Sequence, residues 1–312
     1  MVLAPHKISI VVPCYNEEES LPIFLSAVSA EAAKMQGVSF EYIFVDDGSK
    51  DATLSILRRF SLESAHVKYL SFSRNFGKEA ALLAGLQAAT GDYLVVMDAD
   101  LQDPPHMLPE MYHAVAVEGY DCAAARRTSR KNEPPLRSFF ANRFYGLINK
   151  ISDTKMPNGA RDFRLMTRQM ADAILALKEY NRFTKGLFSW VGFNTKWIDY
   201  EYVPRAAGNT KWSFFRLLLY SIDGIAAFSV KPLALASLIG LLFCFIASLG
   251  IIFIIARWMM FGDPVDGWAS TITIVLFVSG IQLFCTGIIG LYLSKTYMEI
   301  KNRPVYIIKE QS

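Results

Sequence analysis

This chain of 312 residues has few cysteines, a small net charge and no repeated sequence. Each of these features excludes a class of protein. The four cysteines are scattered and no pair has metal-ligand spacing, so we expect neither a zinc site nor a disulfide framework. The formal net charge of +3 is too small to indicate a nucleic-acid partner. The sequence also contains no Walker loop, internal repeat or low-complexity linker.

Charge is absent altogether from two long stretches near the C-terminal end. Residues 233–256 and 268–293 contain no Asp, Glu, Lys or Arg. Each stretch is longer than the roughly 20 residues that cross a bilayer core. We therefore predict two transmembrane helices there, in preference to the alternative of two buried helices in a large soluble domain.

Lys and Arg flank these two stretches more densely than they occupy the connector between them. The positive-inside rule therefore places both termini in the cytoplasm and the connector outside. Residues 1–7 contain no apolar core, so we expect no cleavable signal peptide. The predicted division is a cytoplasmic domain at 1–211, an interfacial segment at 212–231, a transmembrane domain at 232–294 and a cytoplasmic tail at 295–312.

The interfacial segment is predicted from residues 212–228, which are aromatic, apolar and sparsely charged. One or two helices lying in the membrane interface suit this composition, and an ordinary core helix of the soluble domain is the alternative.

Short apolar runs alternate with helical patterns along the N-terminal part of the chain. This alternation predicts an α/β fold, with a mostly parallel sheet covered by helices on both faces. The predicted strands are 8–13, 41–45, 67–72, the run that leads to Asp98, and 121–125, and the predicted helices are 21–35, 53–62 and 78–89.

Three of these strands end in polar clusters, at 15–17, 46–49 and 98–100. Ligands of parallel sheets bind beyond the carboxyl ends of the strands. Because residues two apart in a strand point to the same side, Asp98 and Asp100 are expected to aim at one point. Such carboxylates suit Mg²⁺ or Mn²⁺, and Gln102 could add an amide oxygen. A solvated acidic loop is the alternative.

Several longer segments of the chain resemble a known family. They are similar to inverting family 2 glycosyltransferases of GT-A fold, and more narrowly to polyprenyl-phosphate glycosyltransferases, which include dolichol-phosphate mannose synthase. The general segments are 11–18, 45–51, 73–79 and 98–105, and those that resemble the bactoprenol glucosyltransferase branch are 162–166, 185–192 and 208–212.

The resemblance implies a metal-dependent enzyme of a bacterial inner membrane. Its reaction would be the inverting transfer of a hexose from a nucleotide sugar to undecaprenyl phosphate at the cytoplasmic face, to supply cell-surface glycans. UDP-glucose is the expected donor, while UDP-GlcNAc, UDP-galactose and GDP-mannose remain open. The implied partners are this donor, the polyprenyl phosphate acceptor and the lipid bilayer, and a homo-oligomer is also open.

The resemblance, together with the need of an acceptor phosphate for cationic partners, assigns roles to single residues. For some of them a simpler reading stays open: turn geometry for Pro13 and Tyr15, lipid contact for Lys211, and a solvated basic face for most of the arginines. Nucleotide-sugar binding falls to Pro13, Tyr15, Asn16, Glu17, Asp47, Asp98, Arg205 and Lys211; acceptor-phosphate binding to Arg126, Arg137 and Arg164; metal binding to Asp98, Asp100 and Gln102; and catalysis to Asp162 and Asp100.

Asp162 is the catalytic base by resemblance. A phosphate acceptor is already largely ionised at neutral pH, so Asp162 could instead orient Arg164. The sequence departs from the family at Arg161, where a small residue is expected, and a cation there could tune the pKa of Asp162 or bind phosphate. It also departs at 290–295, where an acid that is common at the end of the span is missing.

Two rival functions are weighed against this one. A processive polysaccharide synthase shares the first domain but usually has a Gln-x-x-Arg-Trp motif and more spans, and the sequence has neither. A membrane-anchored nucleotide-sugar binder without catalysis is disfavoured by the presence of Asp98, Asp100 and Asp162.

Overall fold

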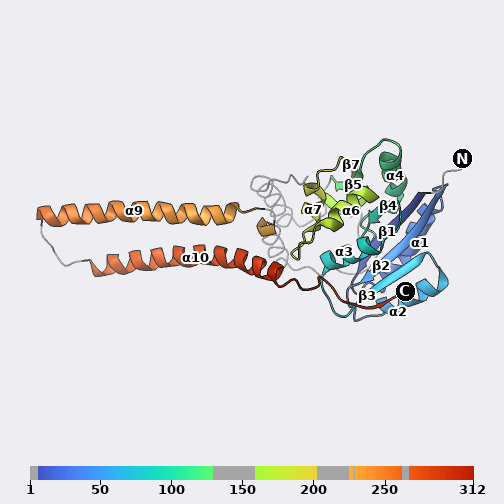
Figure 1. Ribbon diagram of the computed structural model, residues 1–312, viewed down its shortest axis with the longest axis horizontal. Helices are drawn as coiled ribbons and strands as arrows, with labels where there is room; N and C mark the ends of the chain where they lie inside the picture. The colour runs from blue at the N-terminus through green and yellow to red at the C-terminus, as the bar shows by residue number, and fades with distance from the viewer. Residues whose placement is uncertain (1–5, 129–158, 202–224, 228, 262–266) are drawn as a thin grey trace.

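The computed structural model describes residues 6–128, 159–201, 225–227, 229–261 and 267–312. An α/β domain lies at one end of the molecule, and two long helices extend from one side of it (Figure 1). The α/β domain is built on one eight-stranded sheet with the order β7-β5-β6-β4-β1-β2-β3-β8. Its strands are β1 (His6–Cys14), β2 (Val38–Asp46), β3 (Val67–Phe72), β4 (Tyr93–Val96), β5 (Cys122–Arg127), β6 (Ala160–Thr167), β7 (Thr195–Tyr200) and β8 (Ile308–Gln311).

The sheet is mostly parallel and is covered on both faces. Among the described strands, β6 and β8 run antiparallel to their neighbours, while β1, β2, β3 and β4 are parallel, as are β5 and β7. Ile10 and Val11 show the alternation, because the first packs into one core cluster and the second into the other. The helices are α1 (Ser20–Ala32), α2 (Thr53–Glu63), α3 (Lys78–Ala88), α4 (Leu108–Ala116), α6 (Arg168–Ala176) and α7 (Thr184–Trp190), with a 3₁₀ turn, η1, at Pro105–Met107.

The predicted α/β architecture is therefore confirmed, but one local expectation is wrong. β4 ends at Val96, so Asp98 and Asp100 lie in the turn after the strand rather than on the strand itself. Leu101 in this turn has a φ of 56°, a left-handed backbone conformation that occurs in turns. The two carboxylates are consequently placed by turn geometry and not by strand alternation.

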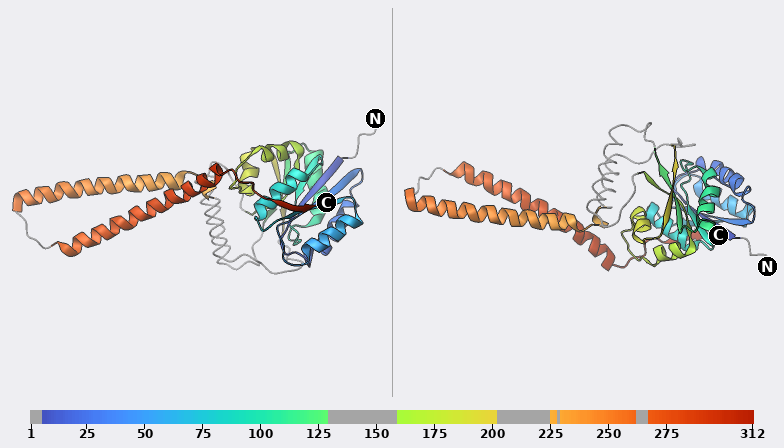
Figure 2. Two further views of the ribbon diagram at one scale, coloured as in Figure 1. Left: turned by 60° about the horizontal axis from the view of Figure 1, so that its bottom comes forward. Right: turned by 90° about the horizontal axis from the view of Figure 1, so that it is seen from above.

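The two long helices are α9 (Lys231–Phe261) and α10 (Trp268–Ile300), and they contain both uncharged stretches. Figure 2 shows that both leave the α/β domain on the same side. Only 6% of the apolar window Lys231–Gly250 and none of Phe277–Ile300 is buried within the molecule. A core helix of a soluble protein would be mostly buried, so this exposure favours two membrane-spanning helices.

The residues after α10 return to the sheet. β8 pairs with β3 and forms the edge of the sheet. The ring of Tyr306 stacks on Phe72 with centroids 4.9 Å apart, and Arg58 forms an ion pair with Glu310 at 2.5 Å. The predicted cytoplasmic tail thus belongs to the fold of the α/β domain.

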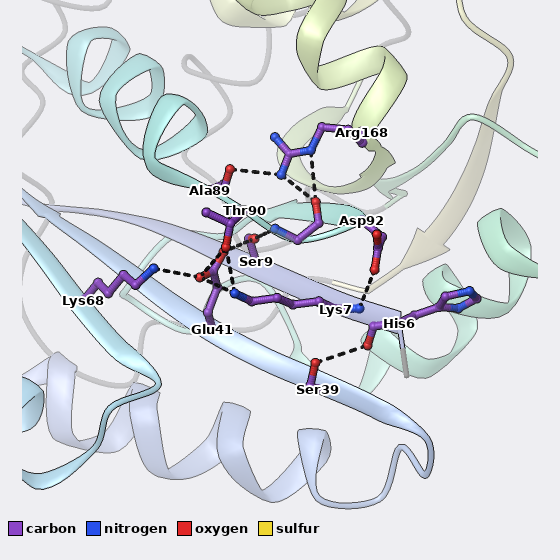
Figure 3. A network of polar contacts seen from close by, with 11 residues as sticks. His6, Lys7, Ser9, Ser39, Glu41, Lys68, Ala89, Thr90, Asp92 and Arg168 are labelled. Carbon is purple, nitrogen blue, oxygen red and sulfur yellow. Dashed lines mark hydrogen bonds and ion pairs between the residues drawn. The ribbon is translucent and has the colours of Figure 1, made fainter. Parts of the chain in front are cut away.

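At the amino ends of the strands, a buried carboxylate joins three of them (Figure 3). Glu41 on β2 is 2% exposed and accepts hydrogen bonds from Ser9 at 2.5 Å and from the backbone N–H of Thr90 at 2.6 Å. Lys7 and Lys68 form ion pairs with it at 2.9 and 3.2 Å. Burial alone would raise the pKa of Glu41, but these partners outweigh burial and lower it to about 2.

Candidate active site

Lys78 joins two of the predicted site carboxylates at the carboxyl edge of the sheet. Its Nζ lies 2.6 Å from Asp98 Oδ1 and 2.7 Å from Asp162 Oδ2. Lys78 is the first residue of α3, and Gly77 before it has a φ of 99°, which a residue with a side chain rarely adopts. This turn lets the chain leave β3 and begin the helix with the ammonium group between the two acids.

Lys78 is not among the site residues that the sequence predicts. The signal was present, because the residue lies in the segment 73–79 that resembles the family and follows a predicted strand of the same sheet. The pairing with Asp162 could not be foreseen from spacing, since β6 enters the sheet beside β4 from a distant part of the chain.

The charges in this cluster stabilise one another. Burial by itself raises the pKa of Asp162, but the charges of Lys78, Lys185 and Arg164 hold that pKa well below its usual range. Desolvation disfavours the ammonium of Lys78, yet Asp162 and Asp98 raise its pKa above the ordinary value. The group is therefore an ammonium ion between two carboxylates at neutral pH.

The acidic turn after β4 is braced by its own hydrogen bonds. The backbone N–H of Gln102 donates to Asp100 Oδ1 at 3.1 Å, and that of Asp98 donates to Asp103 Oδ2 at 3.3 Å. Asp103 is fully buried and forms an ion pair with Arg161 at 3.3 Å. Burial raises the pKa of Asp103 to about 6, although Arg161 opposes the shift. Arg161 thus lies against the acidic turn, which is a structural reason for a bulky cation at this position.

These residues fit a divalent ion only in part. Asp98 and Asp100 supply hard oxygen donors, which suit Mg²⁺ or Mn²⁺. Within the described part of the chain, no three His, Cys, Asp or Glu side chains are grouped so that they could hold an ion by themselves. Mg²⁺ is commonly held by one or two carboxylates together with substrate phosphates, so the two acids match a site that a phosphate-bearing ligand completes.

The loops after β1 and β2 are bound to each other. The backbone N–H of Asn16 donates to the Ser49 hydroxyl at 2.8 Å, and its side-chain oxygen accepts from the N–H of Lys50 at 2.8 Å. The N–H of Glu17 donates to the hydroxyl of Thr53 at 2.8 Å. The predicted nucleotide-binding residues of the first two clusters therefore lie in two loops that are hydrogen-bonded to each other, with Pro13 and Tyr15 at the end of β1.

Asp47, after β2, is bonded to the turn that precedes Lys78. Its carboxylate accepts the backbone N–H of Phe76 at 2.6 Å and that of Gly77 at 2.9 Å. Burial raises the pKa of Asp47 to about 6, against the effect of these two hydrogen bonds. The residue thus fixes the turn before α3, whatever further contact it makes with a ligand.

The predicted phosphate-binding arginines are placed differently from one another. Arg126, at the end of β5, forms a bidentate ion pair with Asp199 of β7. Its Nε and Nη2 atoms donate to the two carboxylate oxygens at 2.6 and 2.8 Å. Arg164 is 3% exposed, lies 3.6 Å from the centre of the Phe188 ring and donates to the carbonyls of Asp162 and Arg161. This placement favours a structural role for Arg164 over contact with an acceptor phosphate. Arg137, Arg205 and Lys211 lie outside the described residues.

Comparison with known proteins identifies the family to which this chain belongs. The sequence model described as Glycosyl transferase family 2 matches residues 9–175. The SfII prophage-derived bactoprenol glucosyl transferase of Shigella flexneri is 41% identical over 97% of this chain and 98% of its own length. The prophage bactoprenol glucosyl transferase homolog of Escherichia coli (strain K12) is 42% identical over 97% of this chain and 98% of its own.

Solved structures that resemble this one have lower sequence identity to the chain. Mannosyl-3-phosphoglycerate synthase from Rubrobacter xylanophilus is 18% identical with a TM-score of 0.49, covering 71% of this chain and 72% of that one. The family match includes the loops after β1 and β2, Lys78, the acidic turn and Asp162, and the full-length relatives extend it over the two long helices. The chain is an enzyme of glycosyl transferase family 2, with a GT-A type fold, and it belongs to the branch of that family that contains the bactoprenol glucosyl transferases.

Proposed function

We propose that the protein transfers one glucose from UDP-glucose to undecaprenyl phosphate, with inversion, at the cytoplasmic face of a bacterial inner membrane. The observation that carries the proposal is the meeting of Asp98, Lys78 and Asp162 at the carboxyl edge of the sheet, in a chain that also has two exposed apolar helices. Two relatives named bactoprenol glucosyl transferases, aligned over nearly their whole length, support the acceptor and the sugar.

The donor would bind along the two hydrogen-bonded loops that follow β1 and β2. Pro13, Tyr15, Asn16 and Glu17 would contact the nucleoside, with Asp47 near the base. Arg205 and Lys211, which lie outside the described residues, would approach the diphosphate. The leaving diphosphate would then lie near the acidic turn.

Asp98, Asp100 and Gln102 would hold a Mg²⁺ or Mn²⁺ ion together with the donor phosphates. When bound, this ion supplies positive charge to the leaving diphosphate. Lys78 orients Asp98 and neutralises part of its charge, so that the turn does not repel the incoming donor.

On the acceptor side, Asp162 would act mainly by orientation. A phosphate monoester carries close to two negative charges at neutral pH, so its oxygen is already nucleophilic and requires little deprotonation. Lys78 fixes the Asp162 carboxylate at 2.7 Å, and Arg126 would contact the acceptor phosphate after Asp199 releases it. Attack from the face opposite the leaving diphosphate inverts the sugar in one displacement.

A donor panel tests this proposal. The purified full-length protein, in proteoliposomes with undecaprenyl phosphate and Mg²⁺ or Mn²⁺, is given radiolabelled UDP-glucose, UDP-GlcNAc, UDP-galactose or GDP-mannose. We expect a glucose-labelled lipid whose formation stops with a chelator, and a β-linked product.

Preference for another sugar would correct the donor and leave the reaction class in place. A product with the α configuration of the donor would exclude the single displacement. A long glucan instead of a single transferred sugar would favour a polysaccharide synthase, and donor binding without any transfer would favour a non-catalytic nucleotide-sugar binder.

A further inference from the structure

The polar end of α10 contacts the α/β domain at a loop that leads to the active site. Beyond its uncharged stretch, α10 continues to Ile300 and carries Glu299 in its last turn. The Glu299 carboxylate accepts the backbone N–H groups of Tyr180 at 3.0 Å and Asn181 at 3.1 Å. The side-chain amide of Asn181 also donates to Glu299 at 3.2 Å and to the carbonyl of Lys295 at 3.4 Å. One carboxylate on a membrane-facing helix therefore binds the backbone of the loop before α7.

That loop is held on its other side by the α/β domain. The buried guanidinium of Arg182 donates to the carbonyls of Leu177 at 2.6 Å and Ile174 at 3.2 Å, which ties the loop to α6. The backbone N–H of Thr184, the first residue of α7, donates to Glu79 at 2.8 Å. The segment 180–185 is consequently held by hydrogen bonds to α10 at one end and to α3 at the other.

The end of this segment at Thr184 and Lys185 is connected to the reacting groups. Glu79 directly follows Lys78, which holds Asp98 and Asp162. Lys185, one residue after Thr184, is among the charges that act on Asp162. The contact with Glu299 therefore fixes where the end of α10 lies relative to Asp162.

We propose that Glu299 is a positioning residue that fixes the end of α10 against residues 180–185, so that an acceptor phosphate at the membrane surface meets Asp162. The inference rests on the proposed function, because it needs an acceptor that is anchored in the bilayer. Carboxylate bonds to backbone N–H groups are stronger than neutral ones, which suits a contact that must hold between two separately anchored bodies. A soluble acceptor diffuses to the site and has no need of this alignment.

The test compares two acceptors in the full-length protein reconstituted into nanodiscs. One is undecaprenyl phosphate in the bilayer, and the other is geranyl phosphate, a short prenyl phosphate added in solution. The variants are Glu299→Ala and Glu299→Gln, with Glu310→Ala as the matched control, because Glu310 binds Arg58 and Tyr69 away from the site. Hydrogen exchange of residues 178–185 is followed in each variant.

We expect Glu299→Ala to lower kcat/KM for undecaprenyl phosphate about tenfold, the effect of losing charge-assisted hydrogen bonds, while the rate with geranyl phosphate is unchanged. Glu299→Gln should fall between this variant and the wild type, since its amide oxygen still accepts one N–H. Exchange at Tyr180 and Asn181 should be faster in Glu299→Ala but not in Glu310→Ala.

Equal losses with both acceptors would reduce Glu299 to a structural residue and overturn the proposal, as would unchanged exchange at residues 180–181. An unchanged rate with undecaprenyl phosphate would overturn it as well. Failure of the proposed function looks different: the wild type itself would then transfer sugar to neither prenyl phosphate.

Discussion

At the scale of single residues, the acidic turn after β4 is the most direct test of metal use. Replacing Asp98 or Asp100 by Asn removes a hard oxygen donor with almost no change in volume. We expect either variant to lower lipid glycosylation by roughly 100-fold or more, because charge at the leaving diphosphate is no longer stabilised. Both variants should still fold, which circular dichroism and thermal unfolding can check. Full activity with the usual metal requirement would show that these carboxylates do not bind the ion.

Arg126 and Asp199 form a second residue-scale test, because each is the other's partner. Arg126→Ala should raise KM for the lipid acceptor about ten- to hundredfold, the value of a charge-assisted contact with phosphate. KM for the nucleotide sugar should hardly change. Asp199→Asn, which frees the guanidinium, should lower KM for the acceptor. Equal effects on both substrates would place Arg126 beside the donor diphosphate instead.

The lowered pKa of Glu41 makes the stability of the folded protein depend on pH. Its pKa in the folded protein is about 2, below the ordinary 4.5, so its contribution is fully present above pH 4.5 and is lost as the pH falls towards 2. Glu41→Gln should lower the free energy of unfolding by roughly 1–3 kcal/mol at pH 7. The difference between variant and wild type should shrink in melts at lower pH. Glu63→Gln is the control, because Glu63 is exposed and its ion pair with Arg59 measures 3.8 Å.

At the scale of elements, local pattern predicted the first half of the sheet well. β3 was expected at its observed bounds, and α3 was expected to begin at Lys78, because each apolar run there matches one element. β8 was not foreseen: Ile308–Gln311 is polar and short, and it becomes a strand only because the edge of β3 is open to it. Tertiary pairing of this kind leaves little trace in sequence.

The same limit applies to the site. The motifs predict site roles for Asp98, Asp100 and Asp162, but the ion pairs of Lys78, Arg161 and Arg126 depend on how β5, β6 and β7 enter the sheet. Spacing along the chain carries no information about contacts between residues so far apart. Charged residues in the motifs could therefore be listed, but their partners could not.

The edge strand alters what a soluble fragment should contain. A chain ending at Lys231 loses β8 and the stacking of Tyr306 on Phe72 as well as both helices. We expect such a fragment to melt at a lower temperature than one in which a flexible linker replaces residues 232–300 and the last 12 residues are kept. Calorimetric binding of UDP with Mn²⁺ compares the two. Identical melting and binding would show that β8 adds nothing to the α/β domain.

At the scale of the whole molecule, α9 leads away from the α/β domain and α10 leads back to it (Figures 1 and 2). The α/β domain and the C-terminus therefore lie at the same end of the two helices. The positive-inside rule assigns that end to the cytoplasm. In a background without reactive native cysteines, a cysteine at Gly267 should react with an impermeant maleimide on intact cells. A cysteine at Lys309 should react only after the cells are opened. The reverse pattern would invert the predicted orientation.

The position of β8 after both long helices also orders the events of synthesis. While the ribosome is still making the protein, β3 has an unpaired edge, and it stays unpaired until Ile308–Gln311 have emerged. Both hydrophobic helices precede these residues, so they reach the insertion machinery first. The glycosyltransferase domain therefore completes its sheet only after both long helices have been made, and a chain truncated before β8 keeps an open edge that quality-control proteases can recognise.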